Sequence, residues 1–188
     1  LGSAAEYGNS NGETFTETSH ANPASLYGLT KNWLYQAAQS YYRLGLPCIH
    51  LRQFNAIGAG QNPFFVVSSF CRQISLMEKG RQKAVLKVGN LNQKRDFIDI
   101  RDMASAYDLT LKLGKAGQIV NICSGKSYYI TEVVDQLKKL TNIKFRVQAD
   151  SKLLNKNKSR ENMVIGSPTI LKKWCWKINI FSIGAPFF

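Results

Sequence analysis

Apolar residues recur at the three-to-four-residue spacing of an α-helix in four segments of the chain. The first runs from Leu26 to Arg43, after Ser25, which can cap it, and before Gly45, which would end it. The apolar positions of this helix are Leu26, Trp33, Leu34, Ala37 and Tyr41. The other predicted helices are 64–78, closed by Gly80, 101–113, ended by Gly114, and 132–140, capped by Thr131. On the helix 64–78 the predicted buried side consists of Val67, Phe70, Cys71, Ile74 and Met77.

Short apolar segments between the predicted helices indicate strands. These segments are 47–54, 84–88, 97–100, 119–123 and 144–147, and residues 1–3 have the character of the end of a further, buried strand. A polar segment without periodicity then continues to Pro23, which is typical of a surface loop. Strands that alternate with helices favour an α/β architecture.

Composition places the chain among ordered globular proteins. Hydrophobic residues make up 44% and aromatic residues 11% of its 188 residues, which is enough to form a packed core. No apolar run approaches the roughly 18–20 residues of a membrane span, so we expect no membrane partner. The four cysteines are scattered, and neither they nor His20 and His50 have the spacing of metal ligands. We therefore expect a cytoplasmic protein with reduced thiols and no metal.

The charge balance is strongly basic. Lys and Arg number 25 against 12 Asp and Glu, for a net charge of +13. A nucleic-acid-binding surface is one interpretation, and a need to bind a substrate diphosphate is another. The lysines concentrate between Lys138 and Lys177, where few aromatic residues occur that could stack on bases. We therefore expect no nucleic-acid partner, and a basic nucleic-acid-binding module remains an alternative.

Tyr27 and Lys31 stand four residues apart in the first predicted helix, so their side chains share one face. An ammonium beside a phenol favours the phenolate, and such a pair can exchange a proton with a reacting oxygen. A solvated helix face is the alternative explanation, and the pair by itself does not decide between the two.

Further motifs accompany this pair in a fixed order. Segment 2–8 (Gly-Ser-Ala-Ala-Glu-Tyr-Gly) places the hydroxyl of Ser3 upstream of Tyr27, and segments 51–61, 95–102 and 120–125 follow downstream. In this order and spacing they resemble the extended short-chain dehydrogenases/reductases that modify nucleotide-sugars. Within that family the chain is most similar to the GDP-mannose branch, which contains the 4,6-dehydratases and the GDP-4-keto-6-deoxy-mannose reductases. The resemblance extends over residues 1–177.

The resemblance implies an α/β fold made of the C-terminal part of a Rossmann-like, doubly wound parallel sheet and a smaller α/β substrate-binding domain. The expected division is 1–58 for the nucleotide-binding part with the catalytic helix, 59–180 for the nucleotide-sugar domain and 181–188 for an irregular tail. Family members carry a Gly-rich dinucleotide motif upstream of the catalytic tyrosine. No such motif occurs here, so we expect a C-terminal part of a longer enzyme that is inactive by itself.

The resemblance also implies roles for single residues. Ser3 would hydrogen-bond the reacting oxygen of the sugar, Tyr27 would exchange a proton with it, and Lys31 would hold the cofactor ribose and activate Tyr27. The cofactor, NADP or NAD, is expected to contact Tyr27, Lys31, Phe54 and Ile57. The expected substrate-binding residues are Asn55, Phe65, Val66, Lys87, Arg95 and Arg160. Phe65 and Val66 are equally well explained by core packing. Arg160 stands in segment 157–161, which departs from the family pattern of an Arg-Pro pair followed by an acid.

One departure from the family bears on the reaction. The resembling dehydratases have a glutamate at the position of Ala5, and Ala5 can neither give nor take a proton. Glu6 is adjacent, but on an extended segment it would point to the other face. We therefore expect an NAD(P)-dependent reduction of the C4 ketone of GDP-4-keto-6-deoxy-mannose, by a homodimer or higher homo-oligomer. GDP-mannose 4,6-dehydratase, a nucleotide-sugar epimerase and an inactive remnant without a cofactor site are the alternatives.

Overall fold

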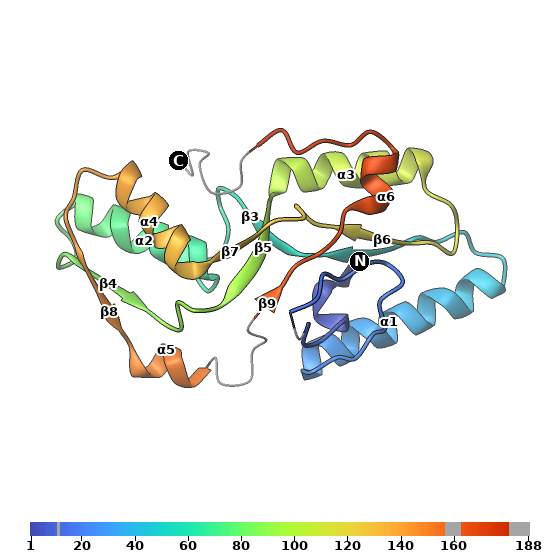
Figure 1. Ribbon diagram of the computed structural model, residues 1–188, viewed down its shortest axis with the longest axis horizontal. Coiled ribbons are helices and arrows are strands. Elements are labelled where there is room, and N and C mark those ends of the chain that lie inside the picture. Colours follow the sequence, from blue (N-terminus) through green and yellow to red (C-terminus); the bar gives the residue numbers. More distant parts are fainter. Residues whose placement is uncertain (11, 157–162, 181–188) are drawn as a thin grey trace.

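The computed structural model describes residues 1–10, 12–156 and 163–180. The molecule is elongated, and its helices and strands gather into two groups that are joined by β3, β5 and β7 (Figure 1). Gly2–Ser3 (β1), Ala4–Glu6 (η1, a 3-10 helix), Leu26–Arg43 (α1), His50–Gln53 (β2), Asn55–Ile57 (β3) and Val66–Glu78 (α2) are the first elements. Val85–Val88 (β4), Lys94–Asp99 (β5), Ile100–Leu113 (α3), Ile119–Ile122 (β6) and Ser127–Tyr129 (β7) follow. The last are Ile130–Leu140 (α4), Arg146–Ala149 (β8), Ser151–Lys156 (α5), Met163–Val164 (β9) and Thr169–Lys173 (α6).

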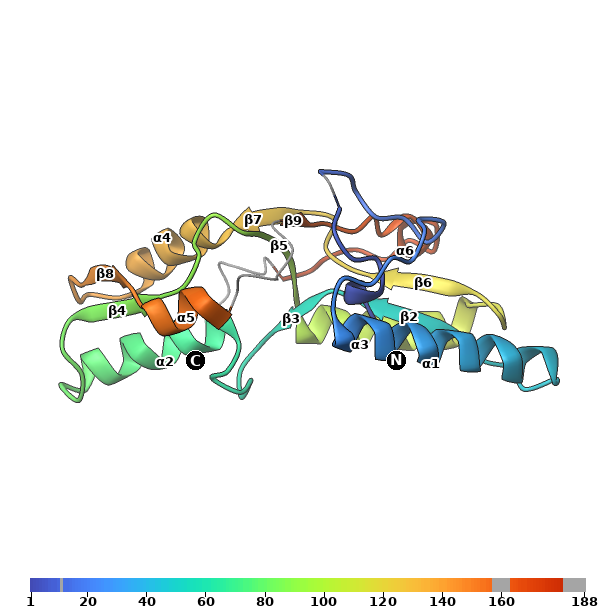
Figure 2. The same ribbon diagram turned by 90° about the horizontal axis from the view of Figure 1, so that it is seen from below.

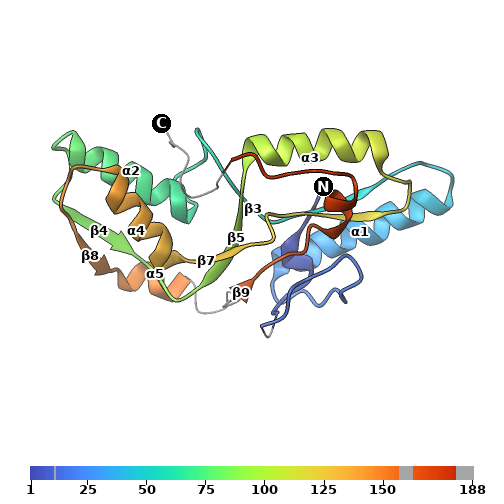
Figure 3. The same ribbon diagram turned by 45° about the horizontal axis from the view of Figure 1, so that its top comes forward.

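A three-stranded parallel sheet of order β1-β2-β6 carries the first group. Gly2 pairs with Arg52, and Leu51 pairs with Val120. Because side chains alternate along a strand, Leu51 of β2 enters the apolar cluster under α3 and α6, whereas Arg52 faces η1 and α1 on the other side. Figures 1 and 3 show α3 and α1 on the two sides of this sheet.

A second group is built on the strands that follow. Parallel β3 and β5 continue into antiparallel β7, and β9 pairs with β5, while β4 and β8 form a separate parallel pair. Helices α2 and α4 lie beside these strands, as Figures 1 and 2 show. The core between them contains Val67, Phe70, Ile74 and Met77, which we expected on the buried side of α2, with Cys71 partly buried against it. The predicted α/β architecture is confirmed.

Several predicted boundaries need correction. The strand predicted at 47–54 is shorter and covers His50–Gln53, β5 begins at Lys94 rather than at residue 97, and β8 begins at Arg146. Thr131 does not cap α4, because it lies inside that helix and its hydroxyl donates to the carbonyl of Leu91. The helix signals of α1 held better: Ser25 accepts from the amide of Gly28, and Gly45 follows the last turn with a φ of 92°.

The larger apolar side chains of α1 do not form its buried face. Leu26, Trp33 and Tyr41 are 75%, 59% and 57% exposed. The helix instead packs against the rest of the fold through a stripe that includes small and polar residues. Gly28 lies against η1, Tyr35 packs beside His50, and Gln39 donates to the carbonyl of Gly117. No described helix combines the length and apolar character that a membrane span needs.

The first sheet combines strands that are far apart in the sequence. β6 pairs with β2, so residues 119–122 belong to the sheet that carries Ser3, although we expected all of 59–180 in the second domain. Helices α3 and α6 pack against that same sheet. The division into two domains stays a prediction, and in this fold neither part is one continuous stretch of sequence. The tail 181–188 lies outside the described residues.

Asp96 of β5 ties three separate segments together. One carboxylate oxygen accepts from the backbone amide and hydroxyl of Ser124 at 2.8 and 2.6 Å, and the other accepts from the amides of Gly125 and Gly166 at 3.0 and 3.2 Å. The side chain is fully buried, and burial raises its pKa to about 6 despite these hydrogen bonds. Asp96 is therefore part of a structural hydrogen-bond network, and nearby Asp99 caps α3 and pairs with Arg101.

We expect Asp96→Asn to lower the free energy of unfolding by about 2–4 kcal/mol, because the new amide group would face two N–H donors instead of accepting from them. Urea unfolding at pH 7.5, where Asp96 is mainly ionised, measures this. Asp108→Asn is the matched control, since Asp108 forms an exposed pair with Lys112 in α3, and such pairs contribute roughly 0.3–0.5 kcal/mol. Equal effects of the two substitutions would contradict the assignment.

Candidate active site

Ser3 lies where the first strand becomes a tight turn. Its backbone pairs with β2, and its φ of −151° and ψ of 149° belong to the cap of η1. The hydroxyl oxygen accepts from the amide of Ala5 at 3.2 Å, and the amide of Ser3 donates to a carboxylate oxygen of Glu6 at 2.8 Å. Among the described residues nothing accepts the hydroxyl proton of Ser3, which is available to a ligand.

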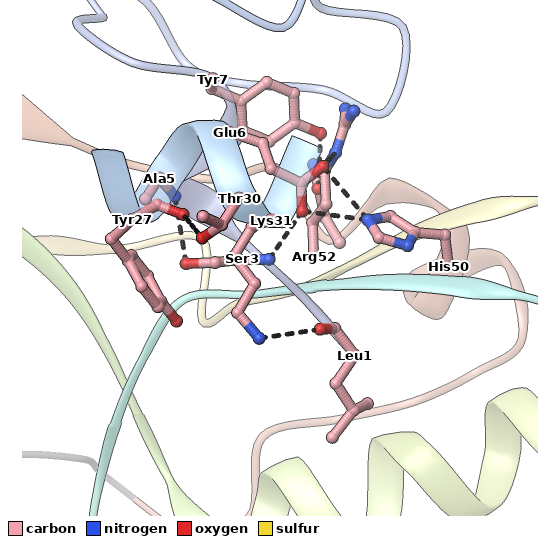
Figure 4. Close-up of polar contacts among 11 residues, drawn as sticks. Leu1, Ser3, Ala5, Glu6, Tyr7, Tyr27, Thr30, Lys31, His50 and Arg52 are labelled. Carbon is pink, nitrogen blue, oxygen red and sulfur yellow. Dashed lines mark hydrogen bonds and ion pairs between the residues drawn. The ribbon is translucent and has the colours of Figure 1, made fainter. Parts of the chain in front are cut away.

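Tyr27 and Lys31 project from the first turns of α1. The Tyr27 ring is 54% exposed, and the ammonium nitrogen of Lys31 lies 5.7 Å from its centroid. That nitrogen also donates to the carbonyl of Leu1 at 3.1 Å, just before Ser3. Figure 4 shows both side chains extending from α1 to the same side, next to Ser3 and Leu1. The helical spacing thus brings the predicted pair together with the end of β1.

Gly28 allows α1 to approach the Ser3 turn. A Cβ at this position would overlap the carbonyl oxygen of Ala5, and the Cβ of Pro23 would lie only 3.1 Å away. Gly28 is also the one buried residue of α1. Because Tyr27 precedes it directly, this close backbone contact places the Tyr27 side chain beside the turn that carries Ser3.

A hydroxyl, a phenol and an ammonium that share one exposed edge can act on a carbonyl group. A phenol can donate the proton that a developing alkoxide needs, and a second hydroxyl can hold the same oxygen. A fixed ammonium can bind a ligand hydroxyl and favour negative charge nearby. In the part of the chain described here, no three His, Cys, Asp or Glu side chains gather to hold a metal ion.

A buried charged cluster lies behind the Ser3 turn. Glu6 contacts Nε of Arg52 at 2.8 Å and Nε2 of His50 at 3.0 Å. Burial by itself would raise the pKa of Glu6, but the hydrogen bonds from His50 and from the Ser3 amide hold it below its usual value. Tyr7 stacks over the Arg52 guanidinium, and burial raises the pKa of Tyr7 to about 12.

Sequence reasoning missed this cluster. We expected Glu6 on an extended segment, but residues 4–6 form a 3-10 helix that turns Glu6 into the interior. Glu6 therefore still cannot substitute for an acid at Ala5, for a different physical reason. The sequence does contain a signal for this cluster, because His50 and Arg52 stand two residues apart and therefore on one face of the strand, with the apolar Leu51 on the other face. His50 is buried, and its Nε2 contacts the Glu6 carboxylate.

Asn55 and Arg95 lie on neighbouring strands. The amide nitrogen of Asn55 donates to the carbonyl of Asp96 at 2.9 Å, which ties β3 to β5. Arg95 is half-buried and donates to the carbonyl of Lys94 at 2.8 Å and to Oε1 of Gln93 at 3.3 Å. Their contacts to a substrate diphosphate stay predictions.

The remaining predicted residues are spread over the molecule. Phe54 and Ile57 have side chains buried in two different apolar clusters, Val66 is partly buried, and Phe65 is 54% exposed at the start of α2. Lys87 is exposed on β4, and its amide donates to Gln73. Arg160 lies outside the described residues. A cavity of about 150 Å³ lies between the segment 58–63 and α2, and its lining includes Gly58, Gly60, Gln61, Pro63 and Arg72.

Comparison with known proteins places the chain in a family. The family model described as GDP-mannose 4,6 dehydratase matches residues 1–171. The chain belongs to this family. It lies within the extended short-chain dehydrogenases/reductases, as the order of motifs predicted.

Individual members of the family match only in part. GDP-6-deoxy-D-mannose reductase of Pseudomonas aeruginosa is 33% identical over 134 residues, which cover 71% of this chain and 40% of that protein. dTDP-D-glucose 4,6-dehydratase of Dictyostelium discoideum is 31% identical over 136 residues, covering 72% and 30% respectively. The chain thus spans less than half the length of these two relatives.

A solved structure shows the same fold. The structure of RMD from Pseudomonas aeruginosa, complexed with NADPH, superposes with a TM-score of 0.89 at 29% identity, over 98% of this chain and 63% of that one. The predicted Rossmann-like α/β fold is confirmed by this similarity.

We expect Gly28→Ala to destabilise the protein by about 1–3 kcal/mol, because the added methyl group overlaps the Ala5 carbonyl. An alanine inside an unobstructed helix would instead stabilise it by about 1 kcal/mol. Thermal unfolding of Gly28→Ala beside Ser40→Ala, at an exposed position of the same helix, measures the difference. An unchanged or higher melting temperature for Gly28→Ala would show that the helix does not rest on the turn.

Proposed function

We propose that this chain is part of an NAD(P)-dependent nucleotide-sugar reductase that reduces the C4 ketone of GDP-4-keto-6-deoxy-mannose. The observation that carries the proposal is the placement of Ser3, Tyr27 and Lys31 at one exposed edge, where α1 meets the end of β1. The 33% identity to a GDP-6-deoxy-D-mannose reductase supports the choice of substrate.

The chemistry of the three side chains suits ketone reduction. The Tyr27 hydroxyl transfers its proton to the C4 oxygen of the sugar, and the free hydroxyl proton of Ser3 hydrogen-bonds the same oxygen. Nicotinamide, when bound, supplies the hydride to C4. Lys31 uses one of its three N–H bonds on the Leu1 carbonyl, so two remain for the ribose hydroxyls of NADP or NAD. Its positive charge also favours the phenolate that proton transfer leaves on Tyr27.

We propose that the sugar diphosphate extends from this edge toward β3 and β5. Asn55 lies on β3 and Arg95 on β5, and these strands are hydrogen-bonded neighbours. A guanidinium suits bidentate binding of a phosphate. Asn55 uses an N–H on the Asp96 carbonyl and keeps its second N–H for a phosphate oxygen. Phe65, Val66, Lys87 and Arg160 remain the proposed contacts to the rest of the nucleotide-sugar.

A 4,6-dehydratase is the second candidate, favoured by the description of the family model. Elimination of water across C5 and C6 needs an acid–base group besides Tyr27. Ala5 occupies the position where the resembling dehydratases have glutamate, and its amide lies next to the Ser3 hydroxyl. Glu6 is bound to His50 and Arg52 in the interior. The chemistry available at the site therefore favours reduction.

We expect Tyr27→Phe to lower kcat for reduction by about 10²–10⁴-fold while cofactor binding persists, because the substitution removes only the proton donor. The protein is prepared from its gene with the coding sequence on both sides of residues 1–188. NADPH oxidation with GDP-4-keto-6-deoxy-mannose is followed at the nicotinamide absorbance band. Tyr41→Phe, an exposed tyrosine of the same helix, is the control. Equal kcat for wild type and Tyr27→Phe would refute Tyr27 as the donor, and no turnover by wild type would refute the reductase.

Ala5→Glu tests the second candidate. We expect this variant to gain measurable conversion of GDP-mannose to the keto sugar, whereas wild type shows none, because the glutamate restores a group that can exchange a proton near Tyr27. The keto sugar is detected by chromatography, and Ala5→Gln is the isosteric control without a titratable group. Dehydration by wild type would replace the reductase proposal with the dehydratase.

A further inference from the structure

The cluster behind the Ser3 turn is costly to build. Glu6 is 0%, Arg52 2% and His50 4% exposed, so three groups that favour water lie in the interior. Apolar residues of similar volume often stabilise a core as well as or better than a buried ion pair. A buried charged cluster therefore contributes less through stability than through the geometry that it imposes on neighbouring residues.

The carboxylate of Glu6 is held from several directions. One oxygen lies 2.8 Å from Nε of Arg52, and both oxygens lie 3.0–3.1 Å from Nε2 of His50. The Tyr35 ring of α1 covers this pair, 5.0 Å from the His50 ring and 5.2 Å from the Arg52 guanidinium. A Cβ at Gly2 would overlap both Glu6 and His50, so the strand β1 packs closely against these two side chains.

The same carboxylate contacts the backbone of Ser3. Its Oε1 accepts from the Ser3 amide at 2.8 Å. The Ser3 hydroxyl in turn accepts from the backbone amide of Ala5, so Ser3 and Glu6 form a capping box around η1. Figure 4 shows Glu6 between Ser3 on one side and the His50 and Arg52 side chains on the other. Any displacement of Glu6 is thereby transmitted to the residue that carries the hydroxyl.

We propose that Glu6, held by His50 and Arg52, is a positioning residue that fixes the Ser3 hydroxyl in its reactive orientation. The inference rests on the proposed function, because it gives Ser3 a task in the reaction. Glu6 itself contacts no reacting atom. It acts through the Ser3 amide, and the strands β1 and β2 supply the frame against which it holds the turn.

Replacement of the Glu6 carboxylate by an amide tests whether Glu6 holds Ser3 in place. In Glu6→Gln one oxygen becomes an NH₂ group, which faces either the Ser3 amide or the His50 and Arg52 donors, so one of these contacts is lost. The Ser3 turn then has fewer constraints although the size of the side chain is unchanged. Glu13→Gln is the matched control, since Glu13 is exposed in the loop that follows.

The decisive experiment is a double-mutant cycle in the protein prepared with its flanking coding sequence. We expect kcat to fall about 10–100-fold in Ser3→Ala and about 10-fold in Glu6→Gln, and the double variant to match Ser3→Ala within about twofold. If kcat of the double variant instead falls by the product of the two single effects, the proposal is overturned, because Glu6 then acts independently of Ser3. If Glu6→Gln does not fold, His50→Gln replaces it in the cycle with the same expectation.

Amide hydrogen exchange of the segment around Ser3 separates failure of this inference from failure of the proposed function. We expect faster exchange at the Ser3 amide in Glu6→Gln than in wild type or Glu13→Gln. If wild type reduces no keto sugar, the proposed function is refuted, and faster exchange still supports the anchoring of Ser3 by Glu6. Unchanged exchange at this amide overturns the inference whatever the activity.

Discussion

The contact between Gly28 and the backbone of Ala5 determines where Tyr27 and Lys31 meet Ser3. Helix α1 carries Tyr27 and Lys31, whereas Ser3 belongs to the end of β1, and neither element reaches the site by itself. A helix can approach a turn this closely only where no side chain intervenes, which glycine permits. The ammonium of Lys31 adds a second tie through the Leu1 carbonyl. The geometry of the site thus depends on backbone approach rather than on large apolar side chains.

This constraint also explains the unusual character of α1. A helix that packs through Gly28, Tyr35 and Gln39 presents its larger apolar residues on the other side. Periodicity identifies such a helix correctly but assigns its buried face to the more apolar stripe. Here the close contacts of the narrower stripe decide the orientation, because they join the helix to the Ser3 turn and to the sheet.

Behind the site, buried charged residues occupy positions where apolar residues usually form the core. Glu6, His50 and Arg52 occupy the face of β2 opposite Leu51, and the Leu51 side is the conventional apolar core under α3. Asp96 does the same between β5 and the segments after β6 and β9. Directional hydrogen bonds define positions more narrowly than apolar packing does. In both clusters the carboxylate belongs to a strand or a 3-10 helix and accepts hydrogen bonds from backbone amides of a neighbouring segment.

The sequence by itself determined the helices α1 to α4, the α/β class and the pairing of Tyr27 with Lys31, because periodicity and helical spacing are local properties. The order of its motifs also indicated the family to which the chain belongs. The tertiary structure decided that β6 joins β2, that α1 turns its apolar stripe outward and that Glu6 lies inside. These outcomes depend on which segments distant in sequence approach one another. Ala5 and Glu6 are neighbours in the chain, yet only the turn into a 3-10 helix sends one to the site and the other into the interior.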